Sequence, residues 1–409
     1  MHSGPWSNDP QAQARLIAWV CLAEVLSMTG FAAYPALLPA LKQAWGLSGT
    51  QAGFVGGSFF FGYMMAVPWL SSLTDRIDAR NVFAASCLTA ASGSAGFALF
   101  AEGPLSGALF QALTGAGLAG TYMPGLKALT DRVTGPHQSR TIAFYTSTFS
   151  IGSSVSLALA GWLGALLGWH GAFALLALGP LLAFGIALVA LAPHASSGAP
   201  RHSPLSALRE VFANRQVRRF VFGYAVHCWE LFSLRSWIVA FLVIAGTAPG
   251  PATGVAALIN LLGLPASVLG NEAALRFGRV PWIRGVMIAA AVLGWLTAFA
   301  ATGPQWILLA LLAAYAVCVM ADSAALTAGL VAAAPASQRG AAMALHSFLG
   351  FGAGFLGPMF FGATLDLAGS GRLAWVLAFG TLSTGGLLWA LLATGRIESR
   401  DIRENERCL

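Results

Sequence analysis

The chain has 409 residues, of which 57% are hydrophobic and only 9% are charged. A soluble domain carries about 25% charged residues, so this composition excludes a water-soluble globular protein. Apolar segments of about 20 residues, the length that crosses a ~30 Å hydrocarbon core, recur from end to end. The alternating segments of ~10 residues that a transmembrane β-barrel needs are not seen, so we expect an all-α integral membrane protein.

The apolar segments, taken in chain order, predict twelve membrane-spanning helices. Their predicted ranges are 16–40, 50–72, 81–101, 104–130, 138–167, 171–192, 220–246, 253–275, 282–301, 305–333, 340–366 and 373–394. The first is too long for the apolar core of a cleavable signal peptide, and the leader 1–14 lacks a basic cluster. The five cysteines are scattered without metal-site or disulfide spacing, and we expect neither a metal nor a cofactor.

The basic residues orient these helices. If the N-terminus is cytoplasmic, nearly all of them fall at cytoplasmic ends or loops, as membrane proteins prefer. They are Arg15, Arg76, Arg80, Lys127, Arg132, Arg140, Arg201, Arg209, Arg215, Arg218, Arg219, Arg276, Arg279, Arg284, Arg339, Arg396, Arg400, Arg403 and Arg407. Lys42 and Arg372 fall outside, and Arg235 lies within a span. A miscounted span would invert every later loop, so the pattern predicts twelve helices with both termini cytoplasmic. The net charge of +7 therefore records topology and predicts no nucleic-acid partner.

A polar segment at 193–219 interrupts the apolar pattern near the middle of the chain. It contains Pro, Ser, Gly and several arginines, which is the composition of a linker. Ser203 and Pro204 suit the N-cap and first position of a helix. Apolar residues then follow at helical spacing: Leu205, Leu208, Val211 and Phe212. We expect either a short helix on the inner membrane surface or an unstructured linker. The predicted organisation is a six-helix bundle at 1–192, this linker, and a second bundle with a short tail at 220–409.

The two sides of the linker repeat one another. The charged turn S-S-L-T-D-R-I-D-A-R-N-V at 71–82 is echoed roughly 200 residues later by N-E-A-A-L-R-F-G-R at 271–279. Gln-Ser-Arg at 138–140 and Ser-Gln-Arg at 337–339 likewise begin equivalent helices. Two similar six-helix halves are a transporter architecture, in which the binding site lies between the halves.

With these features the chain resembles the major facilitator superfamily, whose signature between helices 2 and 3 is G-x-L-A-D-R-x-G-R-R. The first turn keeps four signature residues: Leu73, Asp75, Arg76 and Arg80. It has Ser71 and Asp78 at the glycine positions of the signature and Ala79 at an arginine position. The second copy keeps Arg276, Gly278 and Arg279, while Leu275 replaces the aspartate. The resemblance implies twelve helices in two pseudo-symmetric six-helix bundles.

The resemblance also implies a role for this motif as a cytoplasmic gate. In the family, the signature aspartate pairs with charges and with a helix terminus across the cytoplasmic side, and so latches the outward-facing state. That role falls here to Asp75, which exposed helix N–H groups would favour, with Arg76 and Arg80 around it. The alternative is that these charges merely keep the loop in the cytosol. On helix 4, Gln111 stands where proton-coupled members carry an arginine, which argues against a proton role at that position.

Few ionisable residues lie away from the ends of the predicted spans: Glu24, His227, Glu230, Arg235, Asp322 and His346. A charged residue near the bilayer centre costs roughly 2.5–3.5 kcal/mol on insertion scales, so such residues should face the protein interior or a water-filled cavity. At 1.5 Å per residue, Glu24, His227 and Glu230 lie about 12–16 Å into the membrane. The resemblance adds that helices 1, 4, 7 and 10 line the cavity, and Glu24, Glu230 and Asp322 lie on three of these. These three carboxylates and His227 are the expected proton-coupling residues.

His227 and Glu230 are three residues apart, so both can point into one cavity. A histidine beside a carboxylate in a low-dielectric site can exchange protons near neutral pH, and a buried pair that merely satisfies itself is the alternative. Arg235 has three interpretations. It could hold a substrate carboxylate in a two-pronged fork, pair with Glu230 or Asp322, or reach the outer interface.

Four further residues complete the candidate substrate contacts: Tyr122, Met123, Trp229 and His346. Tyr122 and Met123 lie deep on the fourth helix beside Pro124, which should bend it. Trp229 could line the pathway, although most tryptophans of such a chain are interfacial anchors. His346 faces either helix packing or the cavity.

The expected function is secondary active transport of a small solute across a bacterial inner membrane by rocking of the two halves. The buried carboxylates and histidines predict coupling to H⁺, and Arg235 suggests an organic anion. An uncoupled facilitator or an H⁺-driven efflux pump would have the same fold. No H-E-x-x-H, G-x-S-x-G or phosphate-binding glycine motif is present, so an intramembrane enzyme is not expected, and neither is a sensor. The expected partners are the solute, protons and the lipid bilayer, with the protein acting as a monomer.

Overall fold

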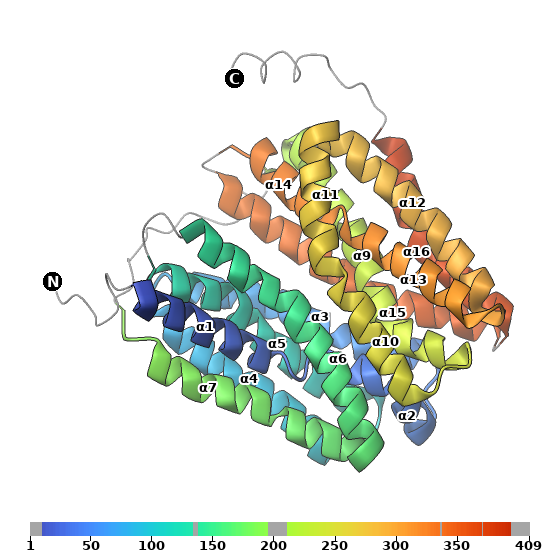
Figure 1. The fold of residues 1–409 in the computed structure, drawn as a ribbon, viewed down its shortest axis with the longest axis horizontal. Helices are drawn as coiled ribbons and strands as arrows, with labels where there is room; N and C mark the ends of the chain where they lie inside the picture. The colour runs from blue at the N-terminus through green and yellow to red at the C-terminus, as the bar shows by residue number, and fades with distance from the viewer. Residues whose placement is uncertain (1–9, 134–137, 195–210, 336–337, 370, 394–409) are drawn as a thin grey trace.

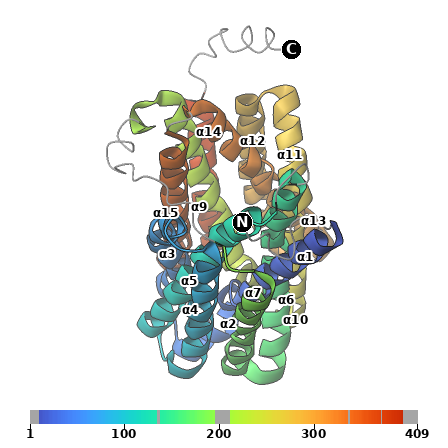
Figure 2. The same cartoon turned by 90° about the vertical axis from the view of Figure 1, so that its left-hand side faces the viewer.

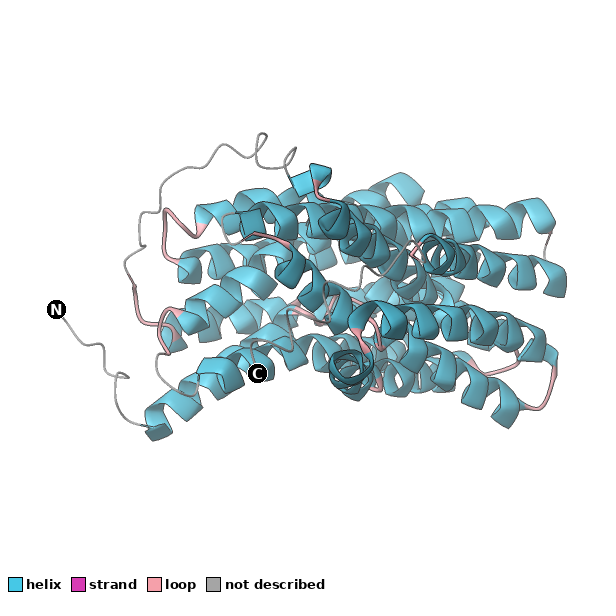
Figure 3. Cartoon of the chain, turned by 90° about the horizontal axis from the view of Figure 1, so that it is seen from above, coloured by secondary structure: helices cyan, strands magenta, loops and turns pink. Residues whose placement is uncertain are grey.

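The computed structural model describes residues 10–133, 138–194, 211–335, 338–369 and 371–393. Within these ranges the regular structure is helical and no strand occurs, as Figure 3 shows. The helices form two groups, one from each half of the chain, which lie side by side in Figure 1. The predicted all-α membrane fold of two six-helix bundles is therefore confirmed.

The first half contains seven helices that cover the first six predicted spans. They are α1 (Pro10–Ser27), α2 (Ala33–Trp45), α3 (Gly49–Leu73), α4 (Ala79–Phe100), α5 (Pro104–Thr130), α6 (Gln138–Leu176) and α7 (Leu178–Ala190). The fifth and sixth spans run on from one another through a kink at Gly168, whose φ of 69° suits glycine. The kink falls in the gap between the predicted ranges 138–167 and 171–192, although α6 continues beyond it to Leu176.

The second half repeats this pattern. Its segments are α9 (Arg215–Ile244), α10 (Pro249–Leu261), α11 (Gly263–Phe277), α12 (Arg279–Phe299), η1 (Ala300–Thr302), α13 (Gln305–Met320), α14 (Ser323–Ala333), α15 (Arg339–Ala368) and α16 (Arg372–Leu392). Of the predicted linker helix, Ser203 and Pro204 lie outside the described residues. Residues 211–213 are helical, and Val211 is buried against Val217 and Phe220 of the second half.

Nine stretches of the described chain are long and apolar enough to cross a membrane. One of these, Phe144–Ala190, holds both the fifth and the sixth span. Two predicted spans fall outside the nine: the first, which is broken into α1 and α2, and the fourth, whose many glycines lower the hydropathy of α5. With these divisions the helices correspond to twelve crossings.

A turn at 28–32 interrupts the first span because a neighbouring helix takes over its backbone hydrogen bonds. The Ser156 hydroxyl of α6 donates to the carbonyl of Thr29 (2.6 Å) and accepts from the N–H of Ala32 (2.9 Å). Gly30 lies so close to Ser94 that a Cβ at this position would be 2.4 Å from the serine Oγ. Backbone groups released inside a membrane must find such partners, so Ser156 stabilises the break.

A second break separates α13 from α14 at Ala321 and Asp322. The indole N–H of Trp282 on α12 donates to the freed carbonyl of Ala321 (3.0 Å). Gly270 of α11 packs on the same carbonyl, where a Cβ would approach its oxygen to 2.0 Å. The break leaves Asp322 buried between helices of the second half.

The helix α3 joins the two halves through close contacts with α15. Three glycines of α3 pack on the α15 backbone: a Cβ on Gly49 would meet Gly362 O at 2.3 Å, on Gly53 Pro358 O at 2.0 Å, and on Gly57 Phe355 O at 2.2 Å. Small residues allow membrane helices to approach in this way. These contacts lie in the first half of α3, which begins at the end of the molecule away from the start of α1. We call this end, marked by Gly49 and Gly362, the opposite face. The end where α1 begins is the N-terminal face, toward which Figure 2 looks.

The opposite face is also fastened by a carboxylate. Asp366 near the end of α15 accepts hydrogen bonds from the N–H of Gly49 (2.6 Å), the N–H of Thr50 (2.7 Å) and the Thr50 hydroxyl (2.6 Å). It thereby caps the N-terminus of α3 from the other half of the chain. Aromatic rings close the centre of the same interface, with Phe60–Phe232 and Tyr63–Phe351 centroids 4.1 and 4.0 Å apart.

Candidate functional site

The ionisable residues of the spans lie in three separate places. Glu24 is buried within the first half, and Arg235 lies between the halves. The remaining four, His227, Glu230, Asp322 and His346, are buried within the second half. The sequence prediction that these residues avoid lipid is consistent with this placement.

Glu24 has only neutral partners. Its Oε2 accepts hydrogen bonds from the hydroxyls of Tyr145 (3.1 Å) and Ser27 (3.3 Å), and Ser27 reaches on to Thr121 (3.2 Å). Its Oε1 is buried without a partner in the described structure. The carboxyl is 0% exposed, so the site is an enclosed polar pocket between α1, α5 and α6.

Glu230 occupies a comparable pocket in the second half. The hydroxyl of Tyr315 on α13 donates to its Oε1 over 2.8 Å. As with Glu24, no cation lies on this carboxyl among the described residues. A buried carboxylate without a counter-charge is costly, and binding a proton removes that cost.

His227 pairs with Asp322 rather than with its helix neighbour Glu230. Its Nδ1 lies 2.7 Å from Asp322 Oδ1, and both side chains are nearly inaccessible to solvent. Neither atom makes a well-aligned hydrogen bond, so the contact is one of proximity and charge. The sequence placed His227 and Glu230 on one helix face, but the pairing with Asp322 depends on the break between α13 and α14.

His346 lies next to this pair through an aromatic stack. Its ring centroid is 3.6 Å from that of Tyr224, which in turn lies 5.6 Å from the ring of His227. The Nε2 atom of His346 is 3.4 Å from Thr327 Oγ1, and its Nδ1 is buried without a partner. His346 was expected to face either helix packing or the cavity. In this structure it packs within the second half and lines neither the cavity beside Arg235 nor its neighbour.

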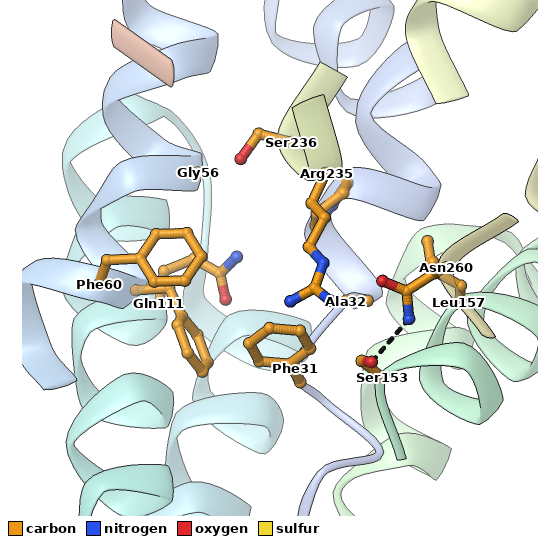
Figure 4. A pocket seen from close by; sticks show the side chains of 12 residues that line it. Phe31, Ala32, Gly56, Phe60, Gln111, Ser153, Leu157, Arg235, Ser236 and Asn260 are labelled. Carbon is orange, nitrogen blue, oxygen red and sulfur yellow. Dashed lines mark hydrogen bonds between the residues drawn. The ribbon is translucent and has the colours of Figure 1, made fainter. Parts of the chain in front are cut away.

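Arg235 lies at a small cavity between the two halves, shown in Figure 4. The cavity, about 20 Å³ in volume, is lined from the first half by the broken helix 1, α3, α5 and α6, and from the second by α9 and α10. Its lining includes Phe31, Phe60, Gln111, Ser153, Arg235 and Asn260. Such a volume holds about one water.

The guanidinium of Arg235 makes no hydrogen bond or ion pair within the described part of the chain, and its Nε is buried without a partner. The ring of Phe149 lies 5.8 Å from its Cζ and covers one face. Of the three interpretations of Arg235, the pairing with Glu230 or Asp322 is not made among the described residues, and the side chain lies at the central cavity. An unpaired cation in such a position is ready to receive an anionic ligand.

Two amides that share the cavity were not singled out as site residues from the sequence. Gln111 is only 1% exposed, and its Oε1 has no partner in the described structure. Asn260 of α10 donates to the hydroxyls of Ser153 (2.7 Å) and Ser154 (2.9 Å) on α6, and so links the halves beside Arg235. An amide in the middle of an apolar span is the signal that could have identified Asn260.

The other predicted contacts lie away from this cavity. Tyr122 meets the ring of Phe149 edge to face (5.3 Å between centroids) and stacks on Tyr145 (6.2 Å), next to the Glu24 pocket. Met123 is 42% exposed. Trp229 donates its indole N–H to the carbonyl of Thr381 (3.2 Å), so it packs against α16 within the second half.

Two residues of the signature turn, Asp75 and Arg80, form no hydrogen bond to the second half among the residues that the structure describes. Asp75 and Arg76 are exposed, and Arg80 donates to the carbonyl of Leu188 on α7 (2.8 Å). In the second copy, the guanidinium of Arg276 lies 5.4 Å from the Phe277 ring, Gly278 has a φ of 88°, and Arg279 begins α12. The Asp75 carboxylate forms no hydrogen bond or ion pair among the described residues.

Asp78, a departure from the signature, is the most strongly held acid of this turn. It caps α4 through the N–H of Arg80 (2.9 Å) and accepts two hydrogen bonds from Arg132 (2.9 and 2.8 Å) and one from the N–H of His194 (2.7 Å). Burial acts to raise the pKa of Asp78, but these hydrogen bonds and the Arg132 charge outweigh it and hold the pKa below 3.8. Asp78 is thus a structural fastening of the first half.

Comparisons with known proteins agree with this architecture. Residues 20–271, more than half of the chain, match the family model described as Major Facilitator Superfamily. No curated protein sequence matches the chain significantly.

Several solved transporters share the fold at low sequence identity. A bacterial homologue of the human lysosomal transporter Spinster, in an inward-facing and unoccupied conformation, superposes with a TM-score of 0.78 at 17% identity, covering 94% of this chain and 96% of its own. A D-xylose–proton symporter gives 0.73 at 16%, with 92% and 96% covered. The nucleoside transporter NupG gives 0.69 at 15%, with 92% and 98% covered.

Proposed function

The chain belongs to the major facilitator superfamily, and from this we propose that it is a secondary active transporter that moves a small anionic solute through the Arg235 cavity with coupling to H⁺. Membership of the family and its multi-pass fold make it a membrane transporter. The solute, the coupling and the orientation are the proposed parts. The observation that carries them is made on the residues that the structure describes: the guanidinium of Arg235 is unpaired there, and the two halves bury three carboxylates without a lysine or arginine partner.

The location of Arg235 supports solute binding. Its cavity is lined by both halves, the arrangement in which rocking exposes a site to each side of the membrane in turn. The broken helix 1 borders the cavity through Phe31 and Ala32, and unwound segments mark binding sites in other transporters. A bidentate carboxylate would complete the hydrogen bonding that the described protein leaves open.

The proposed proton carriers are Glu230, Asp322 and Glu24, with His227 as the partner of Asp322. Glu230 lies on the same helix as Arg235, and its only described hydrogen-bond partner is the hydroxyl of Tyr315. Protonating it therefore breaks no ion pair. A change of charge at Glu230 or at the His227–Asp322 pair would alter the field around Arg235, which gives a physical route from protonation to solute binding.

The arrangement of the halves supports an inward-facing state. We take the N-terminal face as cytoplasmic because the arginine-rich turns lie there. The halves are fastened at the opposite face by Asp366 and by the glycines of α3, whereas Asp75 at the N-terminal face holds no partner among the described residues. We propose that Asp75 engages the other half when the cytoplasmic side closes. We further propose an inner-membrane location and the division into bundles at 1–192 and 220–409.

The coupling is tested by Glu230→Gln in purified protein reconstituted into liposomes, using a solute found by thermal-shift screening of small metabolites. The glutamine oxygen can still accept from Tyr315, so we expect a folded protein. Uptake driven by a pH gradient should be lost, while exchange of solute across the membrane is retained. Glu272→Gln on the exposed surface of α11 is the matched control. Gradient-driven uptake that survives Glu230→Gln would remove Glu230 from the mechanism.

One observation favours an uncoupled facilitator instead. Gln111 occupies the position at which proton-coupled members carry an arginine, and it lines the Arg235 cavity. In that case the uptake rate would not depend on the pH gradient even in the wild-type protein.

A further inference from the structure

We propose that the solute is an aliphatic monocarboxylate, with its carboxylate on Arg235 and its hydrocarbon part in a second cavity that Arg235 also lines. This inference rests on the proposed function and adds the chemical class of the solute. It follows from the charge and the polarity of the residues that line the two cavities that share Arg235.

The charge of the site selects a monoanion. Arg235 is the only ionisable residue among the lining residues of both cavities. The buried acids of the second half, Glu230 and Asp322, contact Tyr315 and His227 and line neither cavity. A zwitterion would bring an ammonium group that finds no acid here, and a dianion would leave its second charge uncompensated in a low dielectric.

The second cavity selects an aliphatic body. It has a volume of about 30 Å³ and, apart from Arg235 and Asn260, its walls are wholly aliphatic. They include Leu231, Leu234, Ile238, Ala256, Ile259 and Met320. A sugar or polyol placed there would lose hydrogen bonds to water without replacing them, whereas a short branched chain gains from burial.

The first cavity adds one polar preference. The Gln111 Oε1 is buried and unpartnered, and an amide can present either its oxygen or its nitrogen to a ligand. A neutral donor near the carboxylate, such as a 2-hydroxyl group, would satisfy the oxygen. The linings of the two cavities thus match the groups of an acid such as 2-hydroxyisovalerate: a carboxylate on Arg235, a hydroxyl near Gln111 and a branched aliphatic chain.

Binding is measured by thermal shift and by calorimetry on the full-length protein in detergent, with isovalerate, 2-hydroxyisovalerate, isovaleramide, valine and succinate as probes. We expect the two monocarboxylates to bind, and the neutral amide, the zwitterion and the dianion to bind at least tenfold more weakly. Arg235→Gln should weaken monocarboxylate binding about 10- to 100-fold, the range for a lost hydrogen bond to a charged group. Arg235→Lys keeps the charge and should retain part of the affinity. Gln111→Leu should remove any preference for the hydroxy acid.

A second test varies the space in the aliphatic cavity and does not require Arg235→Gln to fold. Ala256→Val fills the aliphatic cavity, so isovalerate should lose affinity while acetate does not. Gly254→Ala on the same helix is the control, because an added methyl there meets nothing within 4 Å. Equal binding of isovalerate and isovaleramide, a preference for valine, or binding of none of the acids would overturn the inference.

Transport is read separately, by counterflow of labelled 2-hydroxyisovalerate into proteoliposomes at equal pH, with protein-free liposomes as the baseline for passive permeation of the acid. Counterflow above this baseline, lost in Arg235→Gln, supports both proposals. Binding without counterflow would contradict the proposed transport and leave the ligand class standing. Counterflow of other solutes but not of the acids would contradict the ligand class alone.

Discussion

The partner of each buried carboxyl group separates structural acids from candidate proton carriers. Asp78 is held by the guanidinium of Arg132, whereas the described partners of Glu24 and Glu230 are hydroxyl groups. Protonation of Asp78 would break an ion pair, but protonation of the two glutamates breaks none. The sequence analysis selected Glu24, Glu230 and Asp322 because they lie within predicted spans, since a position within a span can be read from the sequence and the partners of a side chain cannot.

The Asp78–Arg132 pair predicts a pH dependence of stability. The pKa of Asp78 is lowered in the folded protein, so its contribution is present above the unfolded pKa of about 4 and is lost as pH falls through the folded pKa. Asp78→Asn keeps a good N-cap but removes the ion pair, and should lower the stability by about 1–3 kcal/mol near neutral pH. Thermal unfolding of both proteins across acidic pH is the measurement. The difference in Tm should shrink as pH falls below about 4; a difference that is constant with pH would contradict the assignment.

At the scale of helices, the contact between α3 and α15 decides which face is closed. The glycines of α3 let its backbone approach that of α15, and Asp366 of α15 caps the N-terminus of α3. The sequence predicted both spans closely but not their pairing, because the spacing of apolar residues reports burial and not the identity of the neighbour. The breaks at 28–32 and at Ala321–Asp322 were missed for the same reason. They depend on Ser156 and Trp282, which lie far away in the sequence.

Asp366→Asn is predicted to loosen the opposite face. An amide removes the charge that the α3 N–H groups favour and adds a donor facing donors. We expect the loss of about 1–3 kcal/mol to shift the balance toward the outward-open state by about 10- to 100-fold. The measurement is the rate at which an impermeant thiol reagent, added outside, labels Ser236→Cys in the central cavity. The variant is made in a protein from which the native cysteines have been removed.

Thr364→Val is the matched control for Asp366→Asn, because the Thr364 hydroxyl donates only within α15, to the carbonyl of Phe360. It should label as slowly as the protein with native Thr364 and Asp366. If Asp366→Asn labels no faster than this control, Asp366 is an ordinary surface cap and not a latch.

For the whole molecule, composition and the placement of arginines were sufficient to predict the fold. Apolar length gave twelve spans, and the family match confirms the architecture they implied. The site was predictable only in outline. Arg235 and the acids stand out because charge is rare in such a chain, but the sequence left three interpretations of Arg235 open. Its unpaired state results from the packing of both halves around it, and Gln111 and Asn260 join it only through that packing.

The measurement that tests the rocking mechanism most directly is a pair of spin-label distances across the two halves. One pair, Ile77→Cys with Glu272→Cys, reports the N-terminal face, and the other, Glu102→Cys with Thr302→Cys, reports the opposite face; all four positions are exposed. Each pair is measured by pulsed electron paramagnetic resonance with Asp366 intact and with Asp366→Asn, with and without 2-hydroxyisovalerate. We predict two populations. In the first, the distance at the N-terminal face is long and the distance at the opposite face is short; in the second, the N-terminal distance is short and the other is long. Asp366→Asn should enrich the second population. Two distances that stay fixed, or that lengthen together, would contradict alternating access in this protein.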